Sequence, residues 1–447
     1  MKKIKVSLAA TAAVLAMAGL AQAAPAELNI FGASAQYDYW NAQAKDFAEN
    51  VLGCTNVDPA VIDTSKKHGL VVAKNCNATL VPEINSVTGT HDIDIRYSGI
   101  ASAEGPLAAS KQDPVDPALA TGCDKTKGER LMYLTSTTKI CKPVHVGTSD
   151  VAGESLVQMS SGTKLGPMGG TLMNIAMPGV DTSTLNSANT VVVPFGFFAN
   201  EAVKARKCTT GYVGAYCTSD ANCYNGAAGT CSTTSSTIDN ISREEATIIF
   251  SGILTNWKEL GDYFDDVSLV ACLRHAGSGT HSALDLTVMN SGWGSATATD
   301  ASYNPEHVYF NQGSSDEMKC INGATEANPA GSNLVGAIGY ADADQKIAVA
   351  GASDYVKQLK YNGHYPTRSA IRNGLYDFYT NAWLYTSKTA DAATKNRTDA
   401  LVAYAQQSAN VPSTKANFWA SVGEMKFNRL SDINYPVQQF PGDIVFP

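Results

Sequence analysis

The sequence lacks three features that would each define a class of protein. Lysine and arginine number 33 against 41 aspartates and glutamates, and the formal charge is −8, so there is no basic excess of the kind that nucleic-acid-binding surfaces need. Beyond the first 23 residues, no run is long and apolar enough to span a membrane. No two cysteines stand in a C-x-x-C pair, a spacing typical of zinc sites. The first two absences exclude a nucleic-acid partner and a membrane span in the mature chain. The third argues against a zinc site.

The N-terminal 23 residues have the pattern of a secretory signal peptide. Three lysines precede the apolar run Val6–Leu20, and an A-x-A cleavage site ends at Ala23. The alternative is a membrane anchor, which needs about 20 apolar residues and therefore a longer run than this one. No cysteine follows the run, which argues against a lipid anchor. We expect export to the periplasm, or secretion to the cell surface.

Ten cysteines are present, an even number that favours disulfides in an exported chain. Pairing between sequence neighbours would join Cys54 to Cys76, Cys123 to Cys141, and Cys272 to Cys320, with two bridges inside a polar, glycine-rich insert at 208–231. The spacing leaves the connectivity inside the insert open. A metal site in the insert is the alternative, but export favours bridges over zinc. The four insert cysteines are Cys208, Cys217, Cys223 and Cys231.

One strand–turn–helix unit has the composition of an anion site. The apolar run Val267–Leu273 predicts a buried strand, and Ser282–Met289 predicts the following helix. The first N–H groups of a helix have no intrahelical partner, and the helix dipole is positive there. An arginine beside them can grip two oxygens of an oxyanion. The alternative is an ordinary strand-to-helix connection. The residues expected to bind the anion are Arg274, Ser278, Gly279 and Thr280.

Two further strands end in small polar residues. Ala26–Phe31 predicts the opening strand, followed by a turn that contains Gln36 and by a helix over Tyr37–Val51. Asp92–Ile100 alternates polar and apolar residues and runs into a turn of small residues at 101–106 that contains one carboxylate. The opening unit repeats the strand, small turn and helix predicted around Arg274, and Asp92–Ile100 is a third strand that ends in small polar residues.

Four segments together resemble the phosphate-binding proteins of bacterial ABC transporters, within the type II periplasmic-binding superfamily. They are LNIFGASAQY, EEATIIFSGILTNWKEL, LRHAGSGTH, and GAIGY with the later NGLYDFYTNAWLY. The second and third segments follow one another closely and in the family's order. Residues 50–85, 110–190 and 205–235 have no counterpart in the family, so the resemblance is to a divergent member.

The resemblance implies a ligand-binding role for eight residues. Four of them fall on the family's arginine and Gly-Ser-Gly-Thr anion loop. Two fall in the first loop, where the family offers a threonine and an aromatic residue. Two more are the expected counterparts of a Ser-Asp turn whose carboxylate accepts the proton of hydrogen phosphate. The full set is Gln36, Tyr37, Ser102, Glu104, Arg274, Ser278, Gly279 and Thr280.

Two departures from the family bear on selectivity. The family places an aspartate between the arginine and the Gly-Ser-Gly, where it orients the arginine, but this chain has Ala276. In place of the Ser-Asp turn we expect Ser102 followed by Ala103 and Glu104. The acceptor selects hydrogen phosphate because, with an anion that carries no proton, it would stay buried and unpaired.

The resemblance also implies the architecture. We expect an α/β, two-domain type II periplasmic binding protein-like fold, with a hinge of two crossing strands near Val191–Phe198 and Leu334–Ala341. Domain 1 would comprise residues 24–194 plus 341–447. Domain 2 would comprise residues 195–340 and carry the cysteine-rich insert 208–231. The anion would bind in the cleft, and the domains would close over it.

We therefore expect a solute-binding protein for a small tetrahedral oxyanion, inorganic phosphate first, that serves an ABC permease; the resemblance implies no catalysis, cofactor or metal. One alternative is a hydrolase that uses Ser278 with His275 or His281, although no G-x-S-x-G elbow is present and no orienting aspartate can be assigned. The other is a cell-surface or structural protein that keeps the fold without the ligand, as the long insertions suggest.

Overall fold

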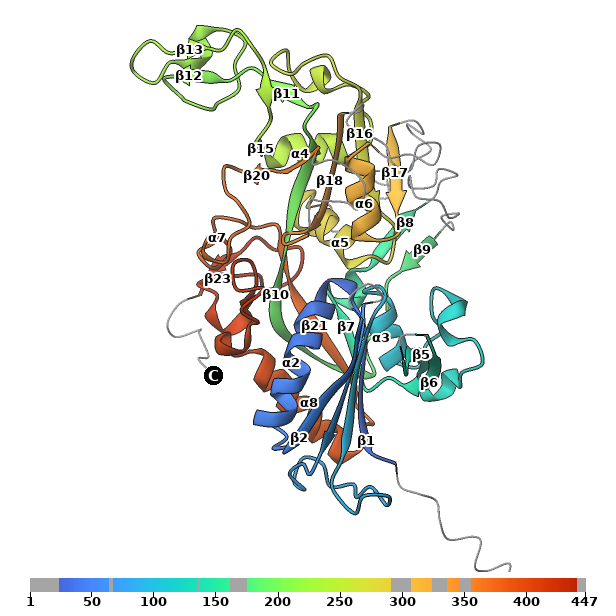
Figure 1. Cartoon of the computed structure of the whole chain (residues 1–447). Helices are drawn as coiled ribbons and strands as arrows, with labels where there is room; N and C mark the ends of the chain where they lie inside the picture. The colour runs from blue at the N-terminus through green and yellow to red at the C-terminus, as the bar shows by residue number, and fades with distance from the viewer. Residues whose placement is uncertain are drawn as a thin grey trace, which may run out of the picture.

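The computed structural model describes residues 24–63, 67–135, 137–160, 175–290, 307–323, 336–345 and 355–439. They form an α/β molecule of two lobes joined end to end (Figure 1). The α/β class predicted from the sequence is therefore confirmed. The expected signal peptide lies outside the described residues. Within those residues, no helix combines the length and hydropathy that a membrane crossing requires.

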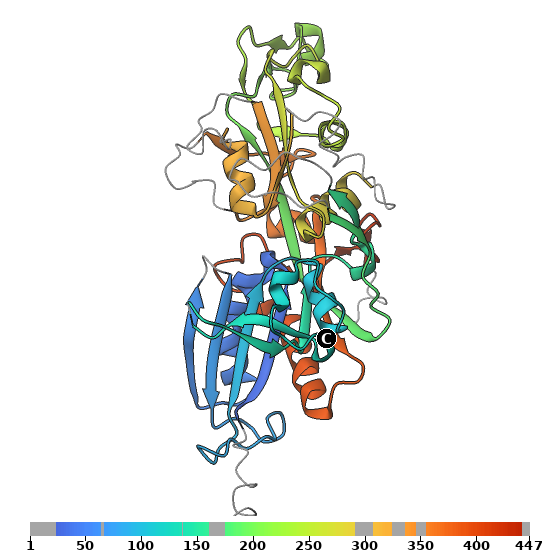
Figure 2. The same ribbon diagram turned by 90° about the vertical axis from the view of Figure 1, so that its right-hand side faces the viewer.

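One 12-stranded sheet runs through both lobes because strand β10 (Leu185–Asn200) belongs to both (Figures 1 and 2). Its path is β17-β16-β18-β10-β21-β7-β1-β4-β3-β2, with β19 and β22 also paired to β10. The first half of β10 pairs with β21 (Tyr379–Ser387) in the lower lobe, and Phe195–Ala199 pairs with β18 (Gly336–Asp342) in the upper lobe. Of the two strands predicted to cross, β10 runs through both lobes, whereas β18 pairs only within the upper lobe and ends at the junction.

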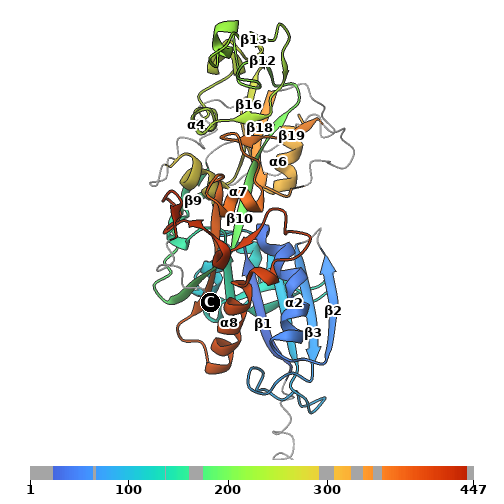
Figure 3. The ribbon, with the colours of Figure 1, turned by 90° about the vertical axis from the view of Figure 1, so that its left-hand side faces the viewer.

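The lower lobe in Figure 1 holds the N-terminal strands and the long helices. Figure 3 shows helices α2 and α8 side by side against the sheet, where the rings of Phe47 and Tyr404 contact each other with centroids 5.5 Å apart. Helix α3 packs on β7 so closely that a Cβ on Gly147 would lie 2.3 Å from the Gly105 carbonyl oxygen. The elements are β1 (Ala26–Gly32), α2 (Tyr37–Asn50), β2 (Asn56–Asp63), β3 (His68–Lys74), β4 (Ile93–Gly99), α3 (Glu104–Ala109), β5 (Glu129–Tyr133), β6 (Lys139–Pro143), β7 (Val146–Ser149) and α8 (Ala392–Ala405).

The upper lobe is built on β16, β17 and β18. Helix α4 begins with a capping box, since Ser242 Oγ accepts from Glu245 N at 3.1 Å and the Glu245 carboxylate accepts from Ser242 N at 2.8 Å. The elements are β11 (Lys204–Ala205), β12 (Cys208–Thr210), β13 (Thr230–Cys231), β14 (Ser236–Thr237), β15 (Asn240–Ile241), α4 (Arg243–Phe250), β16 (Leu269–Arg274), α5 (Gly279–Ala283), β17 (Val308–Asn311), α6 (Ser314–Ile321), β19 (Val356–Gln358) and β20 (Lys360–Tyr361).

The remaining elements lie around the junction of the lobes. They are β8 (Val157–Ser160), β9 (Ile175–Pro178), α7 (Arg368–Arg372), β22 (Ala420–Ser421), β23 (Phe427–Asn428) and β24 (Val437–Gln438). Strands β19 and β20 fall in the range predicted for domain 1, yet they pair with β10 beyond Phe197 and with β15. The domain boundaries at residues 194 and 341 remain a prediction.

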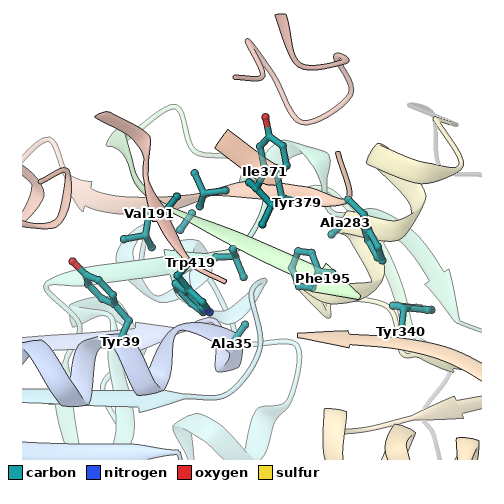
Figure 4. Close-up of a cluster of buried hydrophobic side chains, with 14 of the residues drawn as sticks. Ala35, Tyr39, Val191, Phe195, Ala283, Tyr340, Ile371, Tyr379 and Trp419 are labelled. Carbon is teal, nitrogen blue, oxygen red and sulfur yellow. The ribbon is translucent and has the colours of Figure 1, made fainter. Parts of the chain in front are cut away.

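The apolar core is continuous across the junction. Figure 4 shows side chains of β10, including Val191 and Phe195, with Tyr39 and Trp419 on the lower-lobe side and Tyr340 on the upper-lobe side. All of these side chains are buried. Because apolar area buried in this way stabilises by about 25 cal/mol per Å², the lobes are held by packing as well as by the sheet.

Five disulfides use all ten cysteines. The pairs predicted from sequence neighbours are confirmed: Cys54–Cys76, Cys123–Cys141 and Cys272–Cys320. The insert, whose connectivity the sequence left open, has Cys208–Cys223 and Cys217–Cys231. The bridge from Cys272 to Cys320 is the one nearest the predicted anion site, because it ties strand β16 to helix α6.

We predict that the double variant Cys272→Ala, Cys320→Ala unfolds several degrees below the wild type, since the lost cross-link contributes roughly 3–4 kcal/mol for a loop of this length. Thermal unfolding followed by circular dichroism measures the shift. The control is Cys123→Ala with Cys141→Ala, which removes the bridge between the segment before β5 and strand β6, a bridge that closes a shorter loop than Cys272–Cys320 does. An equal or larger shift in the control would contradict the assignment of β16 and α6 to the stable centre.

Candidate functional site

The strand–turn–helix unit predicted around Arg274 is present. Strand β16 is buried along its whole length, and helix α5 begins at Gly279 with Ser278 as its N-cap. Gly277 has φ +85°, which side-chain-bearing residues rarely adopt. The Ser278 side chain makes no capping hydrogen bond. The hydroxyl at this helix start is therefore not used to satisfy the helix itself.

The start of helix α3, from the lower lobe, lies directly against the start of α5, from the upper lobe. The Ala103 backbone N–H donates to the Gly277 carbonyl oxygen at 3.2 Å. A Cβ added to Gly279 would lie 2.1 Å from Ser102 Oγ and 2.7 Å from Asp150 Oδ2. Only a glycine permits this approach. Two helix starts and one carboxylate thus meet where the lobes face each other.

Asp150 is the carboxylate at this meeting point, and the sequence analysis missed it. It follows β7 directly, since Ser149 is the last residue of that strand. Its Oδ1 accepts from Gln36 Nε2 at 3.1 Å and its Oδ2 accepts from Ser102 Oγ at 3.0 Å. Burial raises the pKa of Asp150 to about 6, against the lowering effect of the Gln36 hydrogen bond. A carboxylate with so high a pKa exchanges its proton near neutral pH.

Arg274 is almost fully buried, and its guanidinium is held by the start of helix α6. Nη1 donates to Ser314 Oγ at 3.0 Å, and Nη2 donates to the Gln312 carbonyl oxygen at 2.8 Å. Within the described residues, Nε has no hydrogen-bond partner. The orienting aspartate that the sequence lacks at Ala276 is thus replaced by a serine hydroxyl and a backbone carbonyl on a neighbouring element.

Two more charged residues, also missed, surround the arginine. Lys67 stands between β2 and β3. Its pKa is lowered by burial and then by Arg274, while Asp342 and Asp150 oppose that shift. Asp342 ends strand β18, and its Oδ2 lies 3.5 Å from Ser314 Oγ. Burial raises the pKa of Asp342. The site therefore combines two cations with two carboxylates that burial makes reluctant to ionise.

Some of the predicted ligand-binding residues lie at the start of α5 and others lie away from it. Gln36 and Ser102 lie near this start, because both donate hydrogen bonds to Asp150. Tyr37 lies in the first turn of α2, with its ring centroid 5.7 Å from Lys67 Nζ. Glu104 faces elsewhere: its Oε1 accepts from Val115 N at 2.8 Å and from Asp116 N at 3.2 Å. Burial raises its pKa to about 7. Asp150, and not Glu104, is the carboxylate beside α5.

The two histidines of the hydrolase alternative have other partners than Ser278. The Tyr340 hydroxyl lies 2.5 Å from His281 Nδ1, and it also accepts from Arg274 N at 3.1 Å. His275 Nδ1 lies 2.7 Å from the Ala276 carbonyl oxygen. Burial lowers the pKa of His275 to about 4 and that of His281 to about 3. Both rings are therefore neutral at pH 7. His281 contacts the Tyr340 hydroxyl, which in turn accepts from the backbone N–H of Arg274.

Comparison with known proteins finds similarity in solved structures only. No protein-family model and no curated sequence matches the chain. The ABC-type phosphate transport receptor from Vibrio cholerae is 14% identical, with a TM-score of 0.39, and the match covers 84% of this chain and 93% of that chain. A phosphate-binding protein from Stenotrophomonas maltophilia is 14% identical, with a TM-score of 0.40 and coverage of 84% and 83%. A human phosphate-binding apolipoprotein is 13% identical, with a TM-score of 0.43 and coverage of 89% and 91%.

These structures belong to phosphate-binding proteins, the class that the sequence motifs resemble, and the similarity extends over most of the chain. This structural similarity is remote. It concerns the backbone fold only and says nothing of the ligand of this protein.

We predict that Gly279→Ala separates the two helix starts, because its Cβ would overlap Ser102 Oγ and the Asp150 carboxylate. Overpacking of this kind costs about 1–3 kcal/mol, and thermal unfolding should show this loss of stability. The matched control is Gly313→Ala, where a Cβ would meet nothing closer than 3.6 Å. Equal stability of the two variants would disprove the contact.

We also predict a pH dependence that originates in Asp150. Its folded pKa is about 6 and lies above the usual value of an aspartate, so the stability that its protonation contributes is present below about pH 4 and is lost as pH rises through 6. At pH 7, Asp150→Asn should therefore be more stable than the ligand-free wild type by roughly 1–3 kcal/mol, with little difference at pH 4. Urea unfolding across this range measures it, with exposed Asp58→Asn as the control. A difference that does not change with pH would refute the buried carboxylate.

Proposed function

We propose that the protein is a solute-binding protein for hydrogen phosphate, held between the starts of helices α3 and α5. The observation that carries the proposal is the position of Asp150. This buried carboxylate lies against the positive end of α5 and close enough to Arg274 for that charge to lower its pKa. A helix start and an arginine attract an anion. A carboxylate in the same place repels any anion that brings no proton to share.

The roles of the residues follow from their donors and acceptors. Backbone N–H groups at the start of α5, the hydroxyls of Ser278 and Thr280, and the Arg274 guanidinium would donate to the oxygens of the anion. Asp150 would accept the proton of hydrogen phosphate, with Gln36 and Ser102 holding its carboxylate in place. Sulfate carries no such proton at neutral pH, so its binding would leave Asp150 unpaired.

Binding would require the present contact between the two helix starts to give way. Gly279 now touches Ser102 and Asp150 directly, so an oxyanion would enter by separating the lobes and would then replace that contact with its own hydrogen bonds. Closure of two lobes around a ligand is a common mechanism in binding proteins. Arg274 and Asp150 are already held in place by hydrogen bonds to their neighbours, which reduces the entropy cost of binding.

Export and delivery to an ABC permease complete the proposal. The pairing of all ten cysteines supports an oxidising compartment such as the periplasm or the cell surface, as does the signal-peptide pattern of the first 23 residues. A permease would then receive phosphate from the open form. The hydrolase alternative is not favoured, because both histidines near Ser278 are directed to other partners.

The test is calorimetry and thermal unfolding of the mature protein with phosphate and with sulfate. At 100 times its dissociation constant, phosphate should stabilise by about 2.7 kcal/mol. Arg274→Ala should abolish the effect, while Arg372→Ala, a half-exposed arginine paired with Glu424, should keep it. Asp150→Asn should lose the discrimination between phosphate and sulfate.

Absence of stabilisation by either anion would reject the proposal. It would favour the alternative of a surface protein without ligand, whose insert exposes Tyr212, Val213 and Tyr224. Equal binding of sulfate and phosphate by the wild type would keep an oxyanion site but reject the role of Asp150.

A further inference from the structure

The residues that follow Asp150 are held by two side chains from the C-terminal part of the sequence. Asp432 Oδ2 accepts from Ala152 N at 2.5 Å, and the Tyr385 hydroxyl accepts from Gly153 N at 2.8 Å. The partners are 280 and 232 positions apart in the sequence. These hydrogen bonds are therefore tertiary contacts and not part of a local turn.

The two N–H groups stand at the start of a short 3-10 helix, η4 (Gly153–Ser155), whose N-cap is Ala152. The first N–H groups of a helix have no partner within it, and an alanine side chain has no oxygen to offer them. Asp432 and Tyr385 supply the acceptors from elsewhere in the chain, as an N-cap side chain does in other helices. The start of η4 therefore cannot shift without breaking one of these hydrogen bonds.

Asp432 is a buried charged residue within a surface segment. It is 4% exposed, whereas Leu430 and Ile433 in the same segment are 79% and 42% exposed. Burial raises the pKa of Asp432 to about 6, and the hydrogen bond from Ala152 N opposes that rise, so the carboxylate is ionised at pH 7. A hydrogen bond to an ionised acceptor is stronger than one between neutral groups. The contact with Ala152 is thus one that offsets the cost of burying this charge.

Asp150 lies between strand β7 and the start of η4. On one side, the carbonyl oxygen of Ser149 accepts from Gln36 Nε2 at 3.0 Å. On the other side, Val151 is fully buried among apolar side chains. Hydrogen bonds to the Asp150 side chain orient its carboxylate, but the place of its backbone depends on the residues before and after it. The backbone is held before Asp150 by β7 and after it by the two contacts to η4.

We propose that Asp432 is a positioning residue for the specificity of the anion site. Through Ala152 it keeps the Asp150 carboxylate where the proton of hydrogen phosphate would meet it, and it does so without touching the ligand. Binding groups need to be held within about 0.5 Å of the productive geometry, and hydrogen bonds from surrounding residues do this. The inference rests on the phosphate site proposed above and adds the residue that fixes its proton acceptor from a distant part of the chain.

The experiment is calorimetry on the mature protein at pH 7 with phosphate, alone and in competition with sulfate. In Asp432→Ala the ratio of the sulfate to the phosphate dissociation constant should fall about tenfold, the effect expected when one hydrogen bond to a charged group is lost. Asp432→Asn should restore most of the ratio, since its amide oxygen can accept from Ala152 N. Tyr385→Phe keeps the ring, removes only the other acceptor, and should lower the ratio by a smaller factor. The matched control is Ser431→Ala, which removes a hydroxyl that donates to Asn434 Oδ1 in the same segment and should keep the wild-type ratio.

A purely structural role of Asp432 gives a different result. The unfolding temperature and the active fraction of Asp432→Ala would fall, while the ratio in the remaining folded protein would stay at the wild-type value. That result would overturn the inference and leave the phosphate site in place. If Asp432→Ala does not fold, Tyr385→Phe decides, because it loosens the same helix start. Where sulfate binds too weakly to measure, the same pattern is expected in the phosphate dissociation constant.

The wild type distinguishes failure of this inference from failure of the proposed function. If it binds neither anion, the phosphate site is rejected, and the role of Asp432 with it. If it binds both anions equally, an oxyanion site remains, but Asp150 does not select and Asp432 has nothing to position.

Discussion

The burial of one positive charge is the constraint on which the centre of the molecule depends. Arg274 is 3% exposed, and a guanidinium without water must find its hydrogen bonds inside the protein. It finds them at the start of helix α6, which the Cys272–Cys320 bridge ties to β16. Tyr340 on β18 takes its backbone N–H. The carboxylates of Asp342 and Asp150 lie close enough to interact with its charge. Charged groups of both lobes therefore lie close together at this point.

The shared sheet determines how the lobes can move. Strand β10 gives its first half to the lower lobe and its second half to the upper lobe, and the core beneath it has no break. Two lobes joined in this way do not rotate freely relative to each other, because a large rotation would disrupt both the hydrogen-bond ladder and the apolar packing. Twisting along β10 needs less disruption, since strands tolerate a range of twist. We therefore expect any opening to be small and confined to the faces that carry α3 and α5.

Local patterns predicted the features that are local. The apolar run, the glycines and the arginine fixed the strand–turn–helix unit at Arg274, and proximity in sequence found three of the five disulfides. The carboxylate was missed because the four-residue strand before Asp150 lies in a polar stretch without clear periodicity, and its importance comes from contacts with Gln36 and Gly279 far away in the chain. Glu104 was chosen by its place after a strand, but in the helix its side chain turns toward the loop at Val115. Sequence periodicity carries no information on such long-range contacts.

The position of β21 has a consequence for how the chain comes together during synthesis. It lies in the lower lobe between β10 and β7, where Trp383 pairs with Ser149, but it is made only after the entire upper lobe. Until it arrives, β7 presents an open edge, and open edges pair with whatever strand is near. Pairings between such distant segments also form slowly. The lower-lobe sheet of a nascent chain can therefore be completed only after synthesis has passed Ser387, the last residue of β21.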